Sequence, residues 1–332
     1  MRVTFLLAGE PDLDALRRLD PDRDEAALQR GERAWVLQTY LRLARAGYPV
    51  ELAGVAPRDG VIVFHVKQRG FLRRRGAPGR AILLAIRADN RTSGFSDFEV
   101  VQNGCFADDR RFFFIPFWPQ PALIPRDPGR GERVERICFK GFVDNLDPSM
   151  RTSDFMQALA ARGVALDIHG VPWGDRAANR DVHLSWGDYA DVDLVLAVRP
   201  TDRRLHTSKP ASKLINAWHA GVPALLGPEY AYRELRRGPL DYLEVTTPGD
   251  ALAAIDRLRG DPALYRAMVD NGRQRAGRFT FDAVLDRWVK LLYQTLPVRL
   301  ATPRALVDRR VPLPARWALR EAVRLACFRA TR

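Results

Sequence analysis

Two lysines at the start of one helix are the residues best suited to bind an anion. Lys209 and Lys213 lie in the segment Ser208–Gly227, where the sequence predicts a helix over Ala211–Ala220, a stop at Gly221 and then a buried strand. The free backbone N–H groups at a helix N-terminus attract phosphate, and nearby cations strengthen that attraction. The pattern therefore indicates a phosphate site. The plainer alternative is an ordinary helix start with two solvated lysines.

Three side chains that can accept a proton follow predicted strands in the first half of the chain. Asp89 follows the apolar run Ala81–Ile86, His65 follows Val61–Phe64, and Glu10 comes shortly after the first strand. A reaction that removes a proton from a hydroxyl needs such a general base. We rank Asp89 first as the catalytic candidate, His65 second and Glu10 third. An internal salt bridge for Asp89 and a buried structural role for His65 remain the alternatives.

A different set of residues follows the predicted strands of the second half. These residues are Gly141, Phe142, His169 and Arg199. Ligands of open α/β sheets bind beyond the carboxyl ends of the strands, and glycine, aromatic and cationic groups there suit a nucleotide. Polar residues also end strands for solubility alone, so position by itself leaves both interpretations open.

The elements that must position these residues alternate between strands and helices. The expected strands are Val3–Ala8, Val50–Ala53, Val61–Phe64, Ile82–Ile86, Phe98–Val101, Ile137–Lys140, Val164–His169, Leu194–Val198 and Pro223–Leu226. The expected helices are Ala26–Ala46, Ser153–Ala161, Ala211–Ala220 and three that begin after Thr247, Asp261 and Thr280, the last ending at Pro297. Buried apolar runs separated by helices are typical of a parallel sheet covered on both faces.

A proline-rich segment separates the two halves. Five prolines fall between Pro116 and Pro128, a density that disfavours helix and central strand. The chain has 332 residues, about twice the size of a typical domain. We therefore expect an N-terminal domain at 1–122, a C-terminal domain at 123–296 and a basic tail at 297–332.

The second half resembles a known module. The helix Ala211–Ala220, the turn Ala220-Gly221-Val222-Pro223, the strand after it and Glu234 resemble the donor-binding module of the GT-B glycosyltransferases. The resemblance covers the second half well, and the first half matches in its layout of strands and helices. It implies an α/β fold of two Rossmann-like domains that face each other across a cleft, the first binding an acceptor and the second a nucleotide-sugar.

The resemblance also implies site residues, although two family positions differ. In the large retaining family of this fold, two glutamates lie eight positions apart and a third follows eighteen positions later. Alignment on the turn places Ser208 and Asn216 at the first two positions and Glu234 at the third. Asn216 keeps the ability to hydrogen-bond a ribose hydroxyl. The two lysines are more similar to GT-B transferases that neutralise the donor diphosphate with basic side chains. The implied donor-binding residues are Arg199, Ser208, Lys209, Ser212, Lys213, Asn216, Gly141, Phe142, His169 and Glu234.

The activity implied by the resemblance is sugar transfer from a nucleotide-sugar to a glycan or lipid-linked acceptor, as in bacterial surface polysaccharide synthesis. Neither a metal nor another cofactor is expected, because GT-B enzymes usually manage the leaving diphosphate without one. Asp191-Val192-Asp193 matches the D-x-D of metal-dependent GT-A enzymes, but it precedes its strand, whereas a metal site should follow one. Two alternatives stay open: a non-catalytic nucleotide- or polyanion-binding module of this fold, and a sugar-nucleotide epimerase.

The net charge of +13 is concentrated in two segments. Arg299–Arg332 contains nine arginines and two acidic residues, and Lys67–Arg75 contains five cations around Phe71 and Leu72 with no acid. Cations beside apolar side chains suit an anionic membrane surface, and a solvated surface or a tail packed across the first domain is the alternative. A nucleic-acid binder would need a continuous basic stripe with stacking aromatics, so we expect no nucleic-acid partner.

The remaining motifs mainly exclude function classes. The three cysteines are far apart, and the sequence contains no Walker loop, H-E-x-x-H or G-x-S-x-G, and no G-x-G-x-x-G after a strand. No apolar run reaches the ~18 residues of a membrane span. We expect a cytoplasmic protein, with peripheral docking at the inner face of the membrane as the option that the basic segments leave open.

Overall fold

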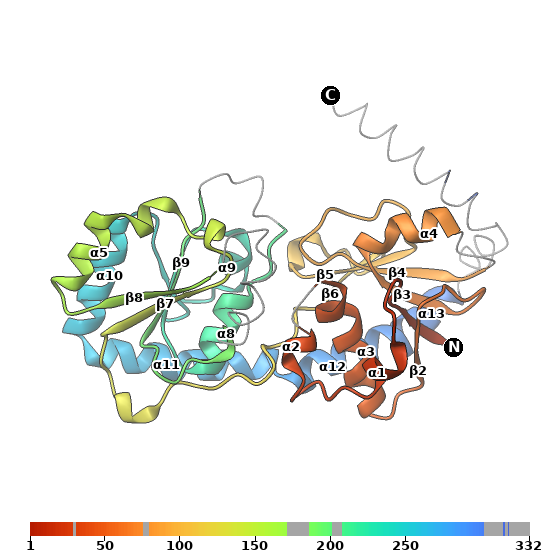
Figure 1. The fold of residues 1–332 in the computed structure, drawn as a ribbon, viewed down its shortest axis with the longest axis horizontal. Helices are drawn as coiled ribbons and strands as arrows, with labels where there is room; N and C mark the ends of the chain where they lie inside the picture. The colour runs from red at the N-terminus through yellow and green to blue at the C-terminus, as the bar shows by residue number, and fades with distance from the viewer. Residues whose placement is uncertain are drawn as a thin grey trace. The chain divides into compact units, whose positions relative to one another are not determined.

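The computed structural model describes residues 1–28, 31–75, 80–170, 186–200 and 208–301, with Ala315 and Ala318, and only the backbone of 73–75. It divides into two compact units (Figure 1). Unit 1 comprises residues 1–117 and 282–332, and unit 2 comprises residues 118–281. The sequence places the boundary at 122 and assigns 282–296 to the second domain, whereas the structure groups those residues with unit 1.

The return of the chain to unit 1 is carried by aromatic packing. The ring centroids of Trp288 and Phe5 lie 6.5 Å apart, and those of Tyr293 and Tyr48 lie 5.3 Å apart. The guanidinium of Arg299 donates a hydrogen bond to a backbone oxygen of the same unit, 2.9 Å away. In Figure 1 the blue helices of this segment accordingly lie among the red helices of the N-terminus.

Unit 1 is built on a six-stranded sheet of order β2-β1-β3-β4-β5-β6, in which every pairing is parallel. Its strands are β1 (Val3–Leu6), β2 (Val50–Ala53), β3 (Val61–His65), β4 (Ile82–Ile86), β5 (Phe98–Val101) and β6 (Phe112–Phe114). Strands β3 and β4 are buried at every position, as expected for the centre of a sheet covered on both faces. The five strands expected from the sequence are confirmed, and β6 is additional.

Both helices expected in unit 1 differ from the structure. The helices of unit 1 are α1 (Leu13–Arg17), α2 (Glu25–Leu28), the π-helical η1 (Arg33–Leu37), α3 (Gln38–Arg45), α4 (Arg69–Arg75), α12 (Phe281–Val289), the π-helical η9 (Lys290–Thr295) and α13 (Leu296–Leu300), with short 3₁₀ turns η2 (Val66–Gln68) and η3 (Gly104–Phe106). Helices α1 and α4 are additional. The helix expected at Ala26–Ala46 is thus interrupted by η1. The prediction that the last helix ends at Pro297 is wrong. This proline lies in the first turn of α13, where its missing N–H is tolerated.

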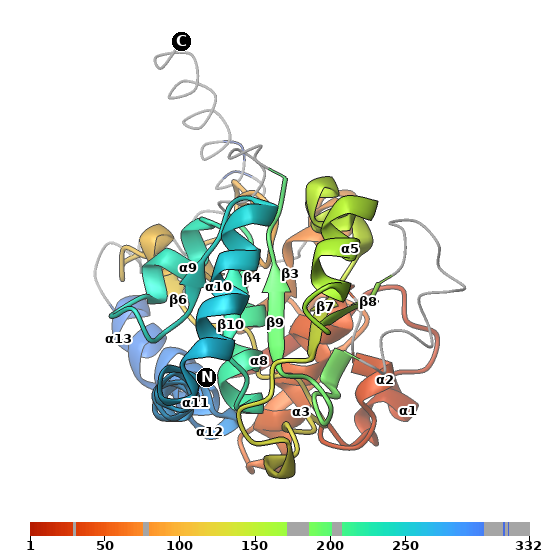
Figure 2. The ribbon, with the colours of Figure 1, turned by 90° about the vertical axis from the view of Figure 1, so that its left-hand side faces the viewer.

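Unit 2 is a five-stranded parallel sheet of order β11-β10-β9-β7-β8. Its strands are β7 (Arg136–Lys140), β8 (Ala165–His169), β9 (Leu194–Ala197), β10 (Ala224–Leu226) and β11 (Leu243–Glu244). Figure 2 shows β10, β9, β7 and β8 side by side in this order. The four strands expected from the sequence are confirmed, and the two-residue β11 is additional.

The helices of unit 2 follow the cap signals of the sequence. They are α5 (Ser153–Ala160), α8 (Ser212–Ala220), α9 (Tyr230–Leu235), α10 (Pro248–Gly260) and α11 (Pro262–Ala276), with 3₁₀ turns η4 (Pro128–Arg130), η5 (Val143–Asn145), η6 (Pro148–Arg151) and η8 (Gly277–Phe279). Thr247 and Asp250 form a capping box at α10, and Asp261 caps α11. Helix α8 ends at Gly221, whose φ of +69° is the left-handed conformation that favours glycine.

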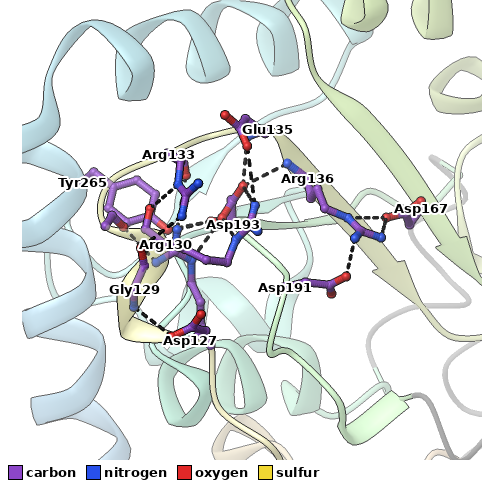
Figure 3. Close-up of polar contacts among 12 residues, drawn as sticks. Asp127, Gly129, Arg130, Arg133, Glu135, Arg136, Asp167, Asp191, Asp193 and Tyr265 are labelled. Atoms are coloured by element: carbon purple, nitrogen blue, oxygen red, sulfur yellow. Dashed lines mark hydrogen bonds and ion pairs between the residues drawn. The ribbon is translucent and has the colours of Figure 1, made fainter.

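A buried carboxylate ties the segment that leads into unit 2 to the amino end of β9 (Figure 3). Asp193 is fully buried. One of its oxygens accepts hydrogen bonds from Arg126 at 2.7 Å and Arg130 at 2.8 Å. The other accepts from Arg130 and from the backbone N–H groups of Glu135 and Arg136. The second aspartate of the D-x-D sequence is therefore engaged by two guanidinium groups at the end of the sheet opposite the strand carboxyl ends.

The basic segment at Lys67–Arg75 is helical and lies within η2 and α4. Leu72 is buried in the core of unit 1 and Phe71 packs against that core, so Leu72 is not available for insertion into a bilayer. The side chains of 73–75 and nearly all of the basic tail lie outside the described residues. None of the helices in the described part of the chain combines the length and the apolar character that a membrane crossing requires.

Candidate functional site

The carboxyl edge of the unit 2 sheet gathers most of the expected ligand-binding residues. The chain passes from β7 to β8 on one side and then to β9 on the other side of β7, so the topological switch point lies between β7 and β9. Ligands of open α/β sheets bind at this point. Gly141 and Phe142 directly follow β7, Arg199 follows β9, and Lys213 lies in the first turn of α8.

Lys213 carries the most perturbed charge of this edge. Its Nζ lies 5.4 Å from the centre of the Phe139 ring. The same Nζ lies so close to Gly141 that a Cβ at that position would be only 3.2 Å from it. Burial, and then the positive charge of Arg199, lower the pKa of Lys213 to about 7. Lys213 makes no ion pair with a carboxylate among the described residues, so the cost of burying its charge is not fully offset there. Such a lysine gains most from an anionic ligand, because the ligand's charge would offset its desolvation.

Arg199 is held in place by two neighbours. Its Nε donates a hydrogen bond to Oε2 of Glu229 at 2.8 Å, and its Nη1 donates to Oδ1 of Asn145. Both residues of the ion pair are almost fully buried. The second terminal nitrogen of the guanidinium, Nη2, is not used by these two bonds. Arg199 therefore presents a fixed donor beside the switch point. The second oxygen of Glu229, Oε1, is buried and has no hydrogen-bond partner among the residues that the structure describes.

Sequence reasoning missed Glu229 and Asn145 and selected Glu234 instead. Glu234 lies near the end of α9, while Glu229 precedes that helix and contacts Arg199. Asn145 ends the turn η5 after β7. The one signal in the sequence was that Glu229 and Asn145 follow the strands β10 and β7 by a few residues. Their contact with Arg199 depends on the order of the strands in the sheet, which the sequence does not show.

The other expected donor-binding residues occupy several environments. Ser208, Lys209 and Ser212 lie immediately before or at the start of α8. Asn216, within α8, accepts a hydrogen bond from the backbone N–H of Gln120 at 3.3 Å. Asn216 is thus already engaged within unit 2.

His169 ends β8 beside two aromatic rings. Trp186 donates its indole N–H to the backbone oxygen of His169 at 2.8 Å, and its ring lies edge-on to Phe142 at 5.7 Å. Burial, and then the charge of Lys140, lower the pKa of His169. His169, Trp186 and Phe142 therefore form an aromatic flank of the carboxyl edge of the sheet. Residues 171–185, which follow it, lie outside the described residues.

The three candidate bases lie at the carboxyl edge of the unit 1 sheet, but their environments differ. Arg33 binds both carboxylate oxygens of Glu10, at 2.8 and 2.5 Å, and this pairing lowers the pKa of Glu10. His65 accepts the backbone N–H of Lys67 at Nδ1, 3.2 Å away, so the neutral ring carries its proton on Nε2. Burial lowers the pKa of His65 to about 4. At neutral pH His65 is therefore a hydrogen-bond donor at Nε2.

Asp89 has the environment best suited to a base. It is half-buried in the turn after β4, and the side chain of Asn90 donates to its Oδ1 at 3.3 Å. The guanidinium of Arg87, two residues before Asp89, pairs with Glu99 at 2.8 Å. Among the three carboxyl-edge candidates, Glu10 is clamped by Arg33 and His65 is held as a donor at Nε2, so Asp89 remains the first choice.

The described residues contain no group of three histidines, cysteines or acids arranged to hold a metal ion. No protein-family model matches the chain, and no curated protein matches it in sequence.

Solved structures do share the fold of this chain. Sucrose-phosphate synthase (tll1590) from Thermosynechococcus elongatus matches with a TM-score of 0.58 and 12% identity, over 90% of this chain and 99% of that protein. Anabaena Alr3699/HepE, in complex with UDP and glucose, matches with a TM-score of 0.54 and 13% identity, over 89% and 100%. TarM matches with a TM-score of 0.53 and 9% identity, over 77% and 58%.

The chain has the GT-B glycosyltransferase fold. The resemblance of the second half implied an α/β fold of two Rossmann-like domains, and the two parallel sheets, of six and five strands, confirm that fold class. Identities of 9–13% establish the GT-B fold and assign no family within it.

Proposed function

We propose that this GT-B protein is a glycosyltransferase that moves a sugar from a nucleotide-diphosphate sugar to a hydroxyl of a glycan or lipid-linked acceptor. We place this reaction in bacterial surface polysaccharide synthesis. The observation that carries the proposal is the half-buried Lys213 with a pKa of about 7, beside Arg199 at the switch point of unit 2. Two such cations suit a diphosphate, and the UDP complex of the similarly folded HepE supports this choice of ligand.

The proposed chemistry is a direct displacement. Asp89 of unit 1 takes the proton of the acceptor hydroxyl while that oxygen bonds to the anomeric carbon. The bond from this carbon to the diphosphate oxygen breaks, and its electron pair leaves with the nucleotide. Lys213 and Arg199 stabilise the charge that develops on the diphosphate, as fixed cations do in a preorganised site. We propose that this charge stabilisation needs no metal.

A nucleotide-release assay tests the proposed activity. The full chain is incubated with UDP-, GDP- and dTDP-sugars, with and without candidate acceptors and EDTA. Release of one nucleotide that depends on acceptor and survives EDTA is expected. Activity that EDTA abolishes would contradict metal independence, and a sugar altered at one carbon without nucleotide release would indicate an epimerase instead.

The affinity for nucleoside diphosphate should fall as the pH rises above about 7. The ligand binds the charged form of Lys213, and the pKa of the free site is about 7. The affinity should therefore drop by up to about tenfold per pH unit between pH 7.5 and 9, where a terminal phosphate with a second pKa near 6 is already ionised. Titration calorimetry in buffers of different ionisation enthalpy should show proton uptake on binding.

Lys213→Arg is the matched variant for this pH dependence. Arginine stays charged throughout this range, so the slope should flatten even if the affinity itself changes. An unchanged slope in Lys213→Arg would assign the titration to another group.

A further inference from the structure

The residue that precedes the candidate base has an unusual backbone. Ala88 has a φ of +50°, a left-handed conformation that non-glycine residues rarely adopt, and it is 2% exposed. It directly precedes Asp89 in the turn after β4. Strained backbone of this kind persists only where the surrounding structure over-determines it, and it concentrates at functional sites. The contacts of this loop, residues 87–97, show what holds Ala88 in this conformation.

A buried carboxylate gathers the two ends of the loop. Glu99, on β5, is fully buried and accepts hydrogen bonds from Nε of Arg87 at 2.9 Å and from the hydroxyl of Thr92 at 2.6 Å. It also accepts from the backbone N–H and hydroxyl of Ser93, at 2.9 and 2.7 Å, and from the hydroxyl of Ser96 at 3.1 Å. Burial would raise the pKa of Glu99, but the bonds from Thr92, Arg87 and Ser93 outweigh it and lower the pKa.

The rest of the loop is fixed by independent contacts. The ring of Phe95 stacks on Phe64 of β3, with centroids 6.0 Å apart. Asp97 closes the loop on β4, because Leu83 donates its N–H to the Asp97 carboxylate at 2.8 Å and accepts the Asp97 N–H at 2.9 Å. A loop anchored at this many points is far more constrained than an ordinary strand connection.

We propose that Glu99 and Arg87 form a clamp that holds Ala88 in its left-handed conformation and thereby aims the Asp89 carboxylate at the acceptor hydroxyl. Glu99, Arg87 and Ala88 are positioning residues, and Asp89 is the group that touches substrate. The proposal rests on the proposed function and adds the device that preorganises its base.

The other strained residues show why Ala88 is distinctive. Asp109 and Ala122 are the remaining non-glycine residues with positive φ in the described ranges, at +52° and +50°. Both are exposed, whereas Ala88 is buried. Ala122 has the same residue type and the same φ as Ala88 but belongs to unit 2 and is not part of the loop. It therefore provides a matched control for relief of backbone strain.

The test compares Ala88→Gly with Ala122→Gly in the full chain. Glycine accepts a positive φ without strain but samples other conformations, so Ala88→Gly should keep or raise the melting temperature while Asp89 spends less time in position. We expect kcat for sugar transfer to fall about tenfold with the donor KM unchanged, since small misplacements of a catalytic group are costly. Ala122→Gly should keep the wild-type kcat.

Two further variants weaken the clamp itself. Glu99→Gln removes the charge that pairs with Arg87. Thr92→Val removes one hydrogen bond to Glu99 from an exposed residue. We expect Thr92→Val to fold even if Glu99→Gln does not. Both should lower kcat and leave nucleotide affinity unchanged, since the proposed diphosphate site is in unit 2.

The outcomes separate this inference from the function beneath it. Wild-type kcat in Ala88→Gly and Thr92→Val, with Asp89→Asn inactive, would overturn the clamp and leave the base assignment standing. Full activity in Asp89→Asn would overturn both the base and the clamp. A folded wild-type protein that transfers no sugar would overturn the proposed function and, with it, this inference.

Discussion

Asp89→Asn should lower kcat for sugar transfer by about 10²–10⁴-fold, the usual contribution of a general base. Asparagine keeps the size and the hydrogen bond to Asn90 but cannot take a proton. The donor KM and nucleotide affinity should stay at wild-type values, because the diphosphate is assigned to Lys213 and Arg199 in unit 2. Initial rates at saturating donor, with nucleotide binding measured separately, check both parts.

Asp109→Asn is the matched control for this loss of activity. Asp109 is an exposed aspartate of unit 1 with a φ of +52°, a conformation that asparagine also accepts. It should keep the wild-type kcat. If Asp89→Asn retains more than a tenth of wild-type activity, Asp89 is not the base.

Asp193→Asn should destabilise unit 2 by about 3–5 kcal/mol, the usual cost of removing one partner of a buried ion pair. The variant leaves the side chains of Arg126 and Arg130, which are 6% and 16% exposed, without their counter-ion. It also weakens the bonds that the carboxylate accepts from the backbone of β7 (Figure 3). Urea unfolding should show a lower midpoint.

The neighbouring aspartate of the same D-x-D sequence is the control for this loss of stability. Asp191 pairs with Arg136 but is half exposed, so Asp191→Asn should cost under about 1 kcal/mol. Equal effects of the two substitutions would contradict the structural role of Asp193.

The long apolar strands could be predicted from the sequence, whereas the shortest strands, the helix α4 and the order of the strands in each sheet could not. The apolar runs of β3 and β4 are uninterrupted, so their burial was predictable from composition alone. The strands β6 and β11 have three and two residues, too few for a pattern to develop. Helix α4 carries mainly glycine and charged residues, and its few apolar contacts with the core left no periodicity to read.

The candidate site was predictable where one element supplies the residues. Lys213 follows from the start of α8, because a helix N-terminus with lysines is a local pattern. Glu229 and Asn145 follow β10 and β7, and they meet at Arg199 only because β9 lies between these two strands. The choice among the three possible bases depended on two contacts, that of Arg33 with Glu10 and that of the Lys67 N–H with His65. Spacing in the sequence does not reveal either contact.

The most direct test of the diphosphate site is calorimetric titration of UDP, GDP, dTDP and ADP into the wild-type protein, Lys213→Ala and Lys290→Ala. Lys290 is an exposed lysine of unit 1 and serves as the control. A charge-assisted hydrogen bond of about 2 kcal/mol corresponds to about 30-fold in affinity. We predict that one nucleotide binds the wild type, about 30-fold more weakly to Lys213→Ala and equally to Lys290→Ala. Binding of none of them to folded protein, or equal binding by Lys213→Ala, would contradict the account.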